Sequence, residues 1–247
     1  MIRSRAFHLC ALLCTLAPGL LAAQFSKATI AGKSATVCTV DARGERIQLF
    51  LHDDSGLPFK SFEMVERHLA QRGEQLVFAI NAGMYHQDLS PVGLLVTNAR
   101  QGAPLNTNTG YGNFFMKPNG VFVITDKGPR VIETSEYPGL KGPILLATQS
   151  GPLLVRAGKI HPQFSTNSTA RLIRNAVGVS RAGSVVFTIT DDPVSLYELA
   201  TLFRDVLDCP DALYLDGVIS SLHAPALKRS DKKADLGPML GVVEAAR

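Results

Sequence analysis

Residues 184–216 restrict the fold of this chain more than any other segment, because they have the pattern of a strand, a helix and a second strand. Residues 184–190 (SVVFTIT) are rich in β-branched side chains. Ser195 and Glu198 then form a Ser-x-x-Glu capping box, which is typical of a helix start, and apolar residues recur at helical spacing behind it. Residues 212–215 (ALYL) complete the pattern. It predicts a βαβ unit with two parallel strands.

The rest of the chain consists mainly of short β-rich runs bounded by Gly, Asn and Pro. Residues 75–80 (QLVFAI) form one such run, and only residues 62–72 show a second helical spacing. Residues 97–120 are rich in Asn, Thr and Gly, which predicts a long surface loop. Many strands, few helices and a βαβ unit near the carboxy terminus predict an α+β domain around a mixed β-sheet.

The amino terminus has the pattern of a secretory signal peptide. Arg3 and Arg5 precede an apolar stretch, residues 6–23, and polar residues begin at Gln24. Pro18 interrupts this stretch, which is also too short for a comfortable membrane span. We therefore expect residues 1–23 to be a leader and residues 24–247 to be a single exported domain. The expected location is the periplasm or the exterior of a bacterium, and no stable membrane span is expected in the mature chain.

The charge of the chain is low and scattered. The formal net charge is +4, and the leader contains two arginines and no acidic residue, so its removal leaves +2. Nucleic-acid binding requires a concentrated basic face, and the sequence shows none. A nucleic-acid partner is therefore not expected.

Cys38 and Cys209 are the two cysteines that remain after removal of the leader. An oxidising compartment favours a disulfide between them. The alternative, two buried free thiols, remains open because sequence alone does not supply the geometry of the pair.

Polar residues follow three of the expected strands. Asp191 and Asp192 end the first strand of the βαβ unit, Asp216 ends its second strand, and Asn81 follows residues 75–80. Because parallel strands place their carboxyl ends at one edge, where open α/β sheets bind ligands, these side chains could meet in one site. Each of them also suits an ordinary turn. Neighbours in a strand point to opposite faces, so at most one of Asp191 and Asp192 should enter the site.

Five polar, glycine-rich segments are attached to the expected strands. They are residues 81–85 (NAGMY), 117–122 (KPNGVF), 149–152 (QSGP), 174–178 (RNAVG) and 215–221 (LDGVISS). In this order, with the helix of residues 195–207 between the last two, they resemble the phosphodiester glycosidase family over about residues 75–243. The family typically continues Leu-Asp-Gly with further glycines before Ser-Ser, whereas this chain has Val218 and Ile219.

The resemblance implies a hydrolase that cleaves the glycosidic bond of a sugar-1-phosphodiester. Such chemistry requires a carboxylate that activates water or attacks the anomeric carbon. Asp216 is the first candidate and Asp191 the second, and Arg174 is the candidate phosphate ligand because its planar fork matches phosphate oxygens. The remaining candidates would bind the sugar or the phosphate. They are Asn81, Gly83, Asn119, Gly120, Gln149, Ser150, Gly151, Asn175, Gly217, Ser220 and Ser221.

Three points stay open at this level. No cofactor is expected, although a divalent cation near Asp216 is compatible with the sequence. The bulky pair Val218 and Ile219 favours a rival function, a non-catalytic protein that binds glycans or assists envelope assembly. A second rival is a metal-dependent phosphodiesterase that cuts the phosphorus–oxygen bond. In each case the expected partner is a sugar phosphate or a glycan.

Overall fold

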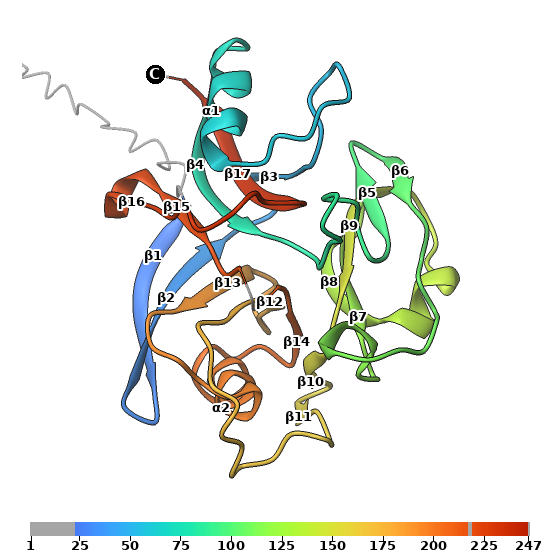
Figure 1. Cartoon of the computed structure of the whole chain (residues 1–247), viewed down its shortest axis with the longest axis vertical. Coiled ribbons are helices and arrows are strands. Elements are labelled where there is room, and N and C mark those ends of the chain that lie inside the picture. Colours follow the sequence, from blue (N-terminus) through green and yellow to red (C-terminus); the bar gives the residue numbers. More distant parts are fainter. Residues whose placement is uncertain (1–22, 217–218, 247) are drawn as a thin grey trace, which may run out of the picture.

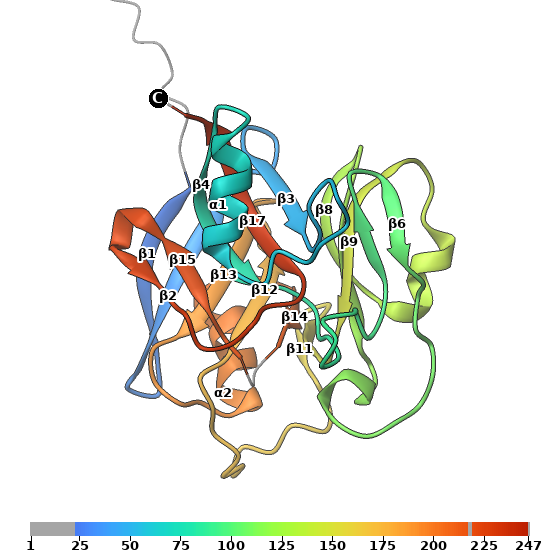
Figure 2. The same ribbon diagram turned by 45° about the horizontal axis from the view of Figure 1, so that its top comes forward.

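A computed structural model describes residues 23–216 and 219–246. The predicted leader up to residue 22, together with Gly217 and Val218, lies outside these residues. Most described elements are strands, which form three sheets (Figures 1 and 2). The prediction of a β-rich domain with few helices is confirmed.

The first sheet has seven strands and the other two have five each. In spatial order, the first sheet contains β1 (Gln24–Ile30), β2 (Lys33–Val40), β13 (Val185–Thr190), β12 (Asn175–Val179), β14 (Asp211–Tyr214), β10 (Leu153–Arg156) and β11 (Lys159–Ile160). The second contains β16 (Arg229–Ser230), β15 (Leu222–Ala224), β4 (Glu74–Asn81), β17 (Met239–Ala245) and β3 (Arg46–Phe50). The third contains β6 (Arg100–Ala103), β5 (Leu95–Thr97), β9 (Ile144–Ser150), β7 (Gly120–Thr125) and β8 (Gly128–Glu133).

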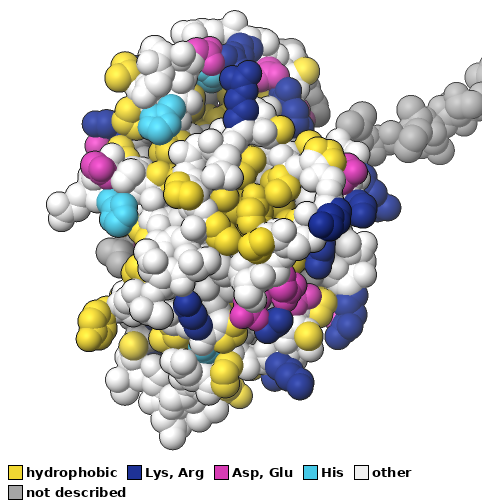
Figure 3. Space-filling view, turned by 90° about the vertical axis from the view of Figure 1, so that its right-hand side faces the viewer, with side chains coloured by type: hydrophobic (Ala, Val, Ile, Leu, Met, Phe, Trp, Pro, Cys, Tyr) yellow, Lys and Arg dark blue, Asp and Glu magenta, His cyan; other side chains and the backbone are white. Residues whose placement is uncertain are grey.

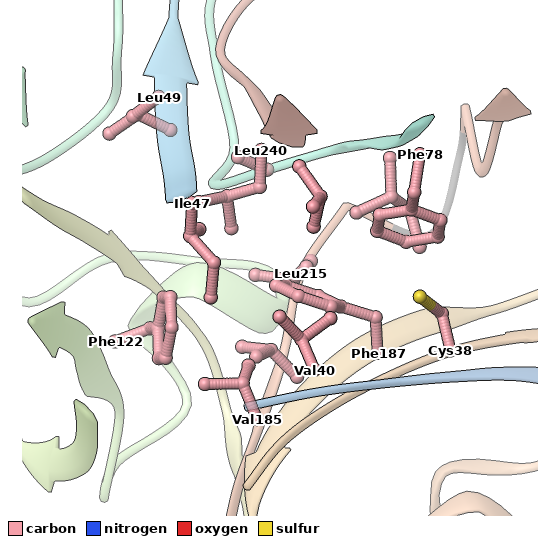
Figure 4. Close-up of a cluster of buried hydrophobic side chains, with 14 of the residues drawn as sticks. Cys38, Val40, Ile47, Leu49, Phe78, Phe122, Val185, Phe187, Leu215 and Leu240 are labelled. Carbon is pink, nitrogen blue, oxygen red and sulfur yellow. The ribbon is translucent and has the colours of Figure 1, made fainter. Parts of the chain in front are cut away.

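One apolar core joins the three sheets. Phe187 of the first sheet, Phe78 of the second and Phe122 of the third are all buried in it (Figure 4). The rings of Phe78 and Phe187 are 5.2 Å apart between centroids, and that of Phe122 lies edge-on to Phe187 at 6.2 Å.

The third sheet presents its other side to one face of the molecule, where hydrophobic side chains gather near the centre and charged ones lie mostly around them (Figure 3).

Two α-helices cover the outer faces of the first two sheets. Helix α1 (Phe62–Ala70) begins at Ser61, whose Oγ accepts a hydrogen bond from Met64 N, and it packs Val65 and Leu69 against the second sheet. Helix α2 (Leu196–Thr201) begins with the predicted capping box and continues into a π-helical turn, Leu202–Val206. Its apolar face packs on the first sheet. Short 3-10 helices form at Asn113–Phe115, Thr134–Gly139 and Pro225–Leu227.

The predicted mixed sheet is wrong, because every pairing among the described strands is antiparallel. Strands β13 and β14 do run in the same direction, with α2 between them in sequence. However, β12 lies between them in the sheet and pairs with both. The physical reason is the tight connection of residues 180–184, which closes β12 and β13 into a hairpin and leaves the other edge of β12 for β14.

The predicted disulfide is also absent, since Cys38 and Cys209 are both free and buried. Cys38 points into the core shared by the three sheets, as Figure 4 shows, whereas Cys209 packs with α2 on the opposite face of the first sheet. A bridge would have to pass through the sheet. Burial raises the pKa of the Cys38 thiol far above its usual value and that of Cys209 to about 12, so neither is a reactive thiolate at neutral pH.

None of the helices in residues 23–216 and 219–246 is long and apolar enough to cross a bilayer.

Candidate active site

The candidate site lies at the start of β12 and the end of β14, two central strands of the first sheet, where they meet the end of β4. Because β12 is antiparallel to β14, the start of one strand lies beside the end of the other, and Leu215 N donates to Asn175 O at 3.2 Å. Asp216 follows at once. Strand β4 of the second sheet ends at Asn81, so both sheets contribute residues to this site.

Two buried asparagines join the sheets. Asn175 Nδ2 donates to Asn81 O at 2.8 Å and to Asn81 Oδ1 at 3.0 Å. The same Oδ1 accepts a bond from Ser221 N at 2.8 Å, and Asn81 Nδ2 donates to Asp216 O at 3.3 Å. Both asparagines are fully buried. Asn81 therefore holds the chain before and after the segment 217–220 at once.

Two serine hydroxyls fix the main chain around Asp216 further. Ser150 Oγ, at the end of β9 in the third sheet, donates to Leu215 O at 3.2 Å. Ser220 Oγ lies 3.2 Å from Asp216 O and 3.1 Å from Ile173 O, and its single proton can serve one of them at a time. All three sheets thus take part in setting the position of the Asp216 main chain.

Asp216 is 8% exposed as a residue, and its carboxylate lies within electrostatic reach of two tyrosines. Burial and the charge of Asp216 raise the pKa of Tyr85 to about 12. Burial raises the pKa of Tyr214 as well, Arg174 opposes this effect, and Asp216 adds to it. Both phenols are therefore protonated at neutral pH and are hydrogen-bond donors; Tyr85 Oη donates to Asp235 O at 3.0 Å.

Arg174 supplies a buried positive charge beside Tyr214. Its Nη1 donates to Tyr214 Oη at 2.8 Å, and its guanidinium lies 5.3 Å from the centroid of the Tyr214 ring. Nε donates to Val194 O and Nη2 to Ala170 O, at 2.8 and 3.1 Å. Three of its five N–H groups are thus already bonded within the protein, and only the remaining two could face a phosphate.

The structure does not bring Asp191 to this site. Its carboxylate binds Lys27 Nζ at 2.7 Å, Thr36 Oγ1 and Ser34 Oγ at 3.0 Å, and Arg229 Nη1 at 3.1 Å. Burial raises the pKa of Asp191, but the hydrogen bonds from its partners outweigh burial and leave the pKa below its usual value. Since Arg229 belongs to β16, this ion-pair cluster ties the first sheet to the second and has no need of a ligand.

Gln149 and Asn119, two of the predicted sugar contacts, both hold loops in the structure. Gln149 Oε1 accepts bonds from Leu94 N and Asn106 N, and Nε2 donates to Asn106 O and Thr134 Oγ1, at distances from 2.7 to 3.2 Å. These four bonds use the full capacity of the amide. Asn119 Nδ2 donates to Phe114 O at 2.9 Å. Both side chains anchor residues 104–119; the predicted loop of residues 97–120 is wrong at its start, where Arg100–Ala103 form β6.

Three predicted ligand-approach glycines are required by close packing within the protein. A Cβ at Gly83 would lie 2.5 Å from Thr148 Oγ1, one at Gly120 would lie 2.6 Å from Ile132 O, and one at Gly151 would lie 2.7 Å from a main-chain carbonyl. Real Cβ atoms do not approach other atoms so closely. The fourth, Gly217, lies outside the described residues.

Sequence reasoning missed the two tyrosines. Tyr85 is the last residue of the NAGMY segment, and Tyr214 precedes Leu215-Asp216. Both therefore lie in or beside candidate segments, but aromatic residues at such places usually belong to the core. The signal was their position two to four residues from candidate polar residues. Among the described residues, no group of three or more His, Cys, Asp or Glu side chains is arranged to hold a metal ion.

The fold and the site together define a β-rich domain that holds a carboxylate where three sheets meet. A model of the phosphodiester glycosidase family matches residues 74–242, and the chain belongs to this family. It is 31% identical over 185 residues to the uncharacterized protein YigE of Escherichia coli strain K12, an alignment that covers 75% of this chain and 72% of YigE.

Solved structures show the same fold at lower identity. The catalytic domain of zebrafish N-acetylglucosamine-1-phosphodiester α-N-acetylglucosaminidase, auto-inhibited by its pro-peptide, superposes with a TM-score of 0.61 at 15% identity, covering 89% of this chain and 81% of that one. A hypothetical protein from Synechocystis gives a TM-score of 0.54 at 15% identity, covering 90% of this chain and 61% of that chain. At these identities the likeness concerns the fold alone.

Proposed function

We propose that this protein is a hydrolase that cleaves the glycosidic bond of a sugar-1-phosphodiester in the cell envelope, to which its leader directs a single domain, residues 24–247. The observation that carries the proposal is the setting of Asp216. Its main chain is held by buried side chains from separate sheets, and its carboxylate lies within electrostatic reach of two protonated phenols, one of which is hydrogen-bonded to the buried Arg174. Membership of the phosphodiester glycosidase family supports the same reaction class.

The chemistry requires only one strong carboxylate. A phosphate ester is a stable anion and leaves readily, so the reaction depends less on a protonating acid than ordinary glycoside hydrolysis does. Asp216 then activates water or attacks the anomeric carbon. The positive charge of Arg174, with Tyr214 bound to it, stabilises the negative charge that develops on the leaving phosphate.

The first substrate to test is an N-acetylglucosamine-1-phosphodiester, because the zebrafish protein of the same fold is named for that linkage. Purified mature protein would be incubated with a panel of sugar-1-phosphodiesters, and released sugar would be measured by chromatography. We expect Asp216→Asn to lower turnover by roughly 10²–10⁴-fold. Asp211→Asn is the matched control, since Asp211 begins β14, the strand that precedes Asp216. Wild-type turnover in Asp216→Asn would remove Asp216 from the mechanism.

Labelled water identifies the bond that breaks. Hydrolysis in H₂¹⁸O places the label in the sugar if the glycosidic bond is cleaved and in the phosphate if the phosphorus–oxygen bond is cleaved. Label in the phosphate would contradict the proposed reaction and favour a phosphodiesterase.

Glycan binding without turnover is the second candidate function. Ile219, which stands where the family typically has glycine, is partly buried and packs against the core beneath α1. This contact favours a stiffer segment after Asp216 than glycines would allow. Saturable binding of a sugar phosphate in calorimetry, with no sugar released on long incubation, would support this candidate over the hydrolase.

A further inference from the structure

A second group of reactive side chains lies on the outer face of the second sheet, away from the shared core. His223 in β15 and Ser230 in β16 are directly opposed across the strand pair, and His223 Nδ1 lies 3.0 Å from Ser230 Oγ. On the other side of the ring, Glu66 Oε1 of helix α1 lies 3.2 Å from Nε2. A serine, a histidine and a carboxylate thus stand in series, in the order used by serine hydrolases.

The imidazole is held firmly while its two partners reach solvent. His223 is 5% exposed and its ring lies 5.8 Å from that of Phe62 between centroids. Ser230 is exposed, and the Glu66 side chain is 41% exposed. Nε2 is within ion-pair distance of Glu66 but makes no hydrogen bond of good geometry among the described residues, so a small rotation of the half-exposed carboxylate is needed to complete the series.

The charge state of His223 suits a general base. Burial lowers the pKa of the imidazole and the nearby Glu66 acts in the opposite direction, with a net lowering. The ring is therefore neutral at pH 7. With the proton on Nε2, facing Glu66, Nδ1 offers its lone pair to the Ser230 hydroxyl.

Ser230 opens into a pocket of about 290 Å³ that also contains the first turn of α1. Ser61, Phe62 and Glu63 line it from the helix side. Ser61 Oγ occupies Met64 N, whereas the N–H groups of Phe62 and Glu63 have no partner within the helix. N–H groups at a helix start are suitable donors to an oxyanion.

We propose that Ser230, His223 and Glu66 form a second, serine-based site that hydrolyses short-chain acyl esters. Ser230 Oγ forms a bond to the ester carbonyl carbon while its proton passes to His223 Nδ1. The bond from that carbon to the leaving alcohol then breaks, and the alcohol takes the proton from the imidazole. Water repeats both steps on the acyl-serine and releases the acid, so no further reactant is required. The small pocket accommodates a short acyl group.

The test uses the intact mature protein with a fluorophosphonate probe, and with p-nitrophenyl acetate as the ester. We expect the probe to label Ser230, located by peptide mass spectrometry, and ester hydrolysis to fall by roughly 10³-fold in Ser230→Ala. Ser26→Ala is the matched control, because Ser26 is likewise exposed on an edge strand but contacts no histidine within the described part of the chain. It should keep both labelling and hydrolysis.

Glu66→Gln separates a positioning role from a merely structural one. It keeps the size of the side chain and should lower the labelling rate several-fold while leaving the thermal unfolding midpoint unchanged. The series would be refuted if the folded wild type were labelled no faster than the heat-denatured protein, or if labelling persisted in Ser230→Ala. In either case the His223–Ser230 contact would be only a cross-strand pair that stabilises the hairpin. Labelling is measured without any sugar substrate and is therefore independent of the proposed glycosidase.

Discussion

Replacement of Asn81 by alanine is expected to lower the free energy of unfolding by about 3 kcal/mol and to disturb Asp216 at the same time. The side chain makes three hydrogen bonds in a fully buried place: it accepts from Asn175 Nδ2 and Ser221 N, and it donates to Asp216 O. All three are lost together in Asn81→Ala.

The magnitude follows from what each former partner retains. Asn175 Nδ2 still has the main-chain oxygen of residue 81, and Asp216 O can accept from Ser220 Oγ when that hydroxyl turns away from Ile173 O. Each of these losses therefore costs roughly 0.5 kcal/mol, at the low end for a net hydrogen bond. Ser221 N keeps no partner among the described residues. A buried N–H left without a bond costs about 2 kcal/mol.

Urea unfolding of the mature protein, followed by far-UV circular dichroism, measures this change. For a domain of this size a slope of about 2 kcal/mol per M places the midpoint of Asn81→Ala about 1.5 M below that of the wild type. Asn167→Ala is the control, because that asparagine is exposed and its side chain has no partner among the described residues; it should stay within about 0.5 kcal/mol. A loss of less than about 1 kcal/mol in Asn81→Ala would refute the view that this amide holds the segment after Asp216.

Three further changes test other parts of the structure. Gly83→Ala should destabilise by about 1–3 kcal/mol in the same unfolding assay, because the added Cβ would overlap the main chain at Gln149; an unchanged midpoint would contradict the packing explanation. Asp191→Asn should destabilise the protein at neutral pH without lowering sugar release. The pKa of Asp191 is lowered on folding, so the stability that its carboxylate contributes is present above the unfolded pKa of about 3.9 and is lost as pH falls through the folded pKa. The difference in unfolding free energy between Asp191→Asn and the wild type, measured in urea titrations, should therefore shrink only at acid pH. A difference that stays constant with pH would contradict this explanation. Tyr85→Phe should lower turnover by roughly tenfold with little change in stability, and unchanged kinetics would exclude the phenol from the reaction.

Local patterns in the sequence predicted local structure well. The Ser195–Glu198 capping box exists with both of its hydrogen bonds, and Ser61 caps α1, because these bonds depend on residues three positions apart. The same holds for strand ends: Asn81 ends β4 as expected, and the polar residues after strands β4 and β14 do meet. Contacts of this kind can be predicted from a few neighbouring residues in the sequence.

The pairing of strands that are distant in the sequence could not be predicted in this way. Nothing in residues 184–216 indicates that β12 would lie between β13 and β14, since that depends on which hairpin forms and which edge stays open. The sequence also did not show which face of its sheet each side chain lies on. Cys38 and Cys209 are compatible with a disulfide in sequence, yet the first sheet lies between them, and Gln149 resembles a ligand group until its four bonds to loop atoms are seen.

The structure distinguishes the position of Asp216 from the access that a ligand has to it, two properties that the sequence did not distinguish. Its position depends on side chains at the ends of β4 and β9 and at the start of β12, all outside the segment that departs from the family pattern. Ile219 takes part in none of these bonds. It stands between two fixed points, Asp216 and Ser221, where a branched side chain restricts the backbone more than glycine does. The hydrolase and the glycan-binding candidates thus share one carboxylate and differ in the access that this segment allows to it.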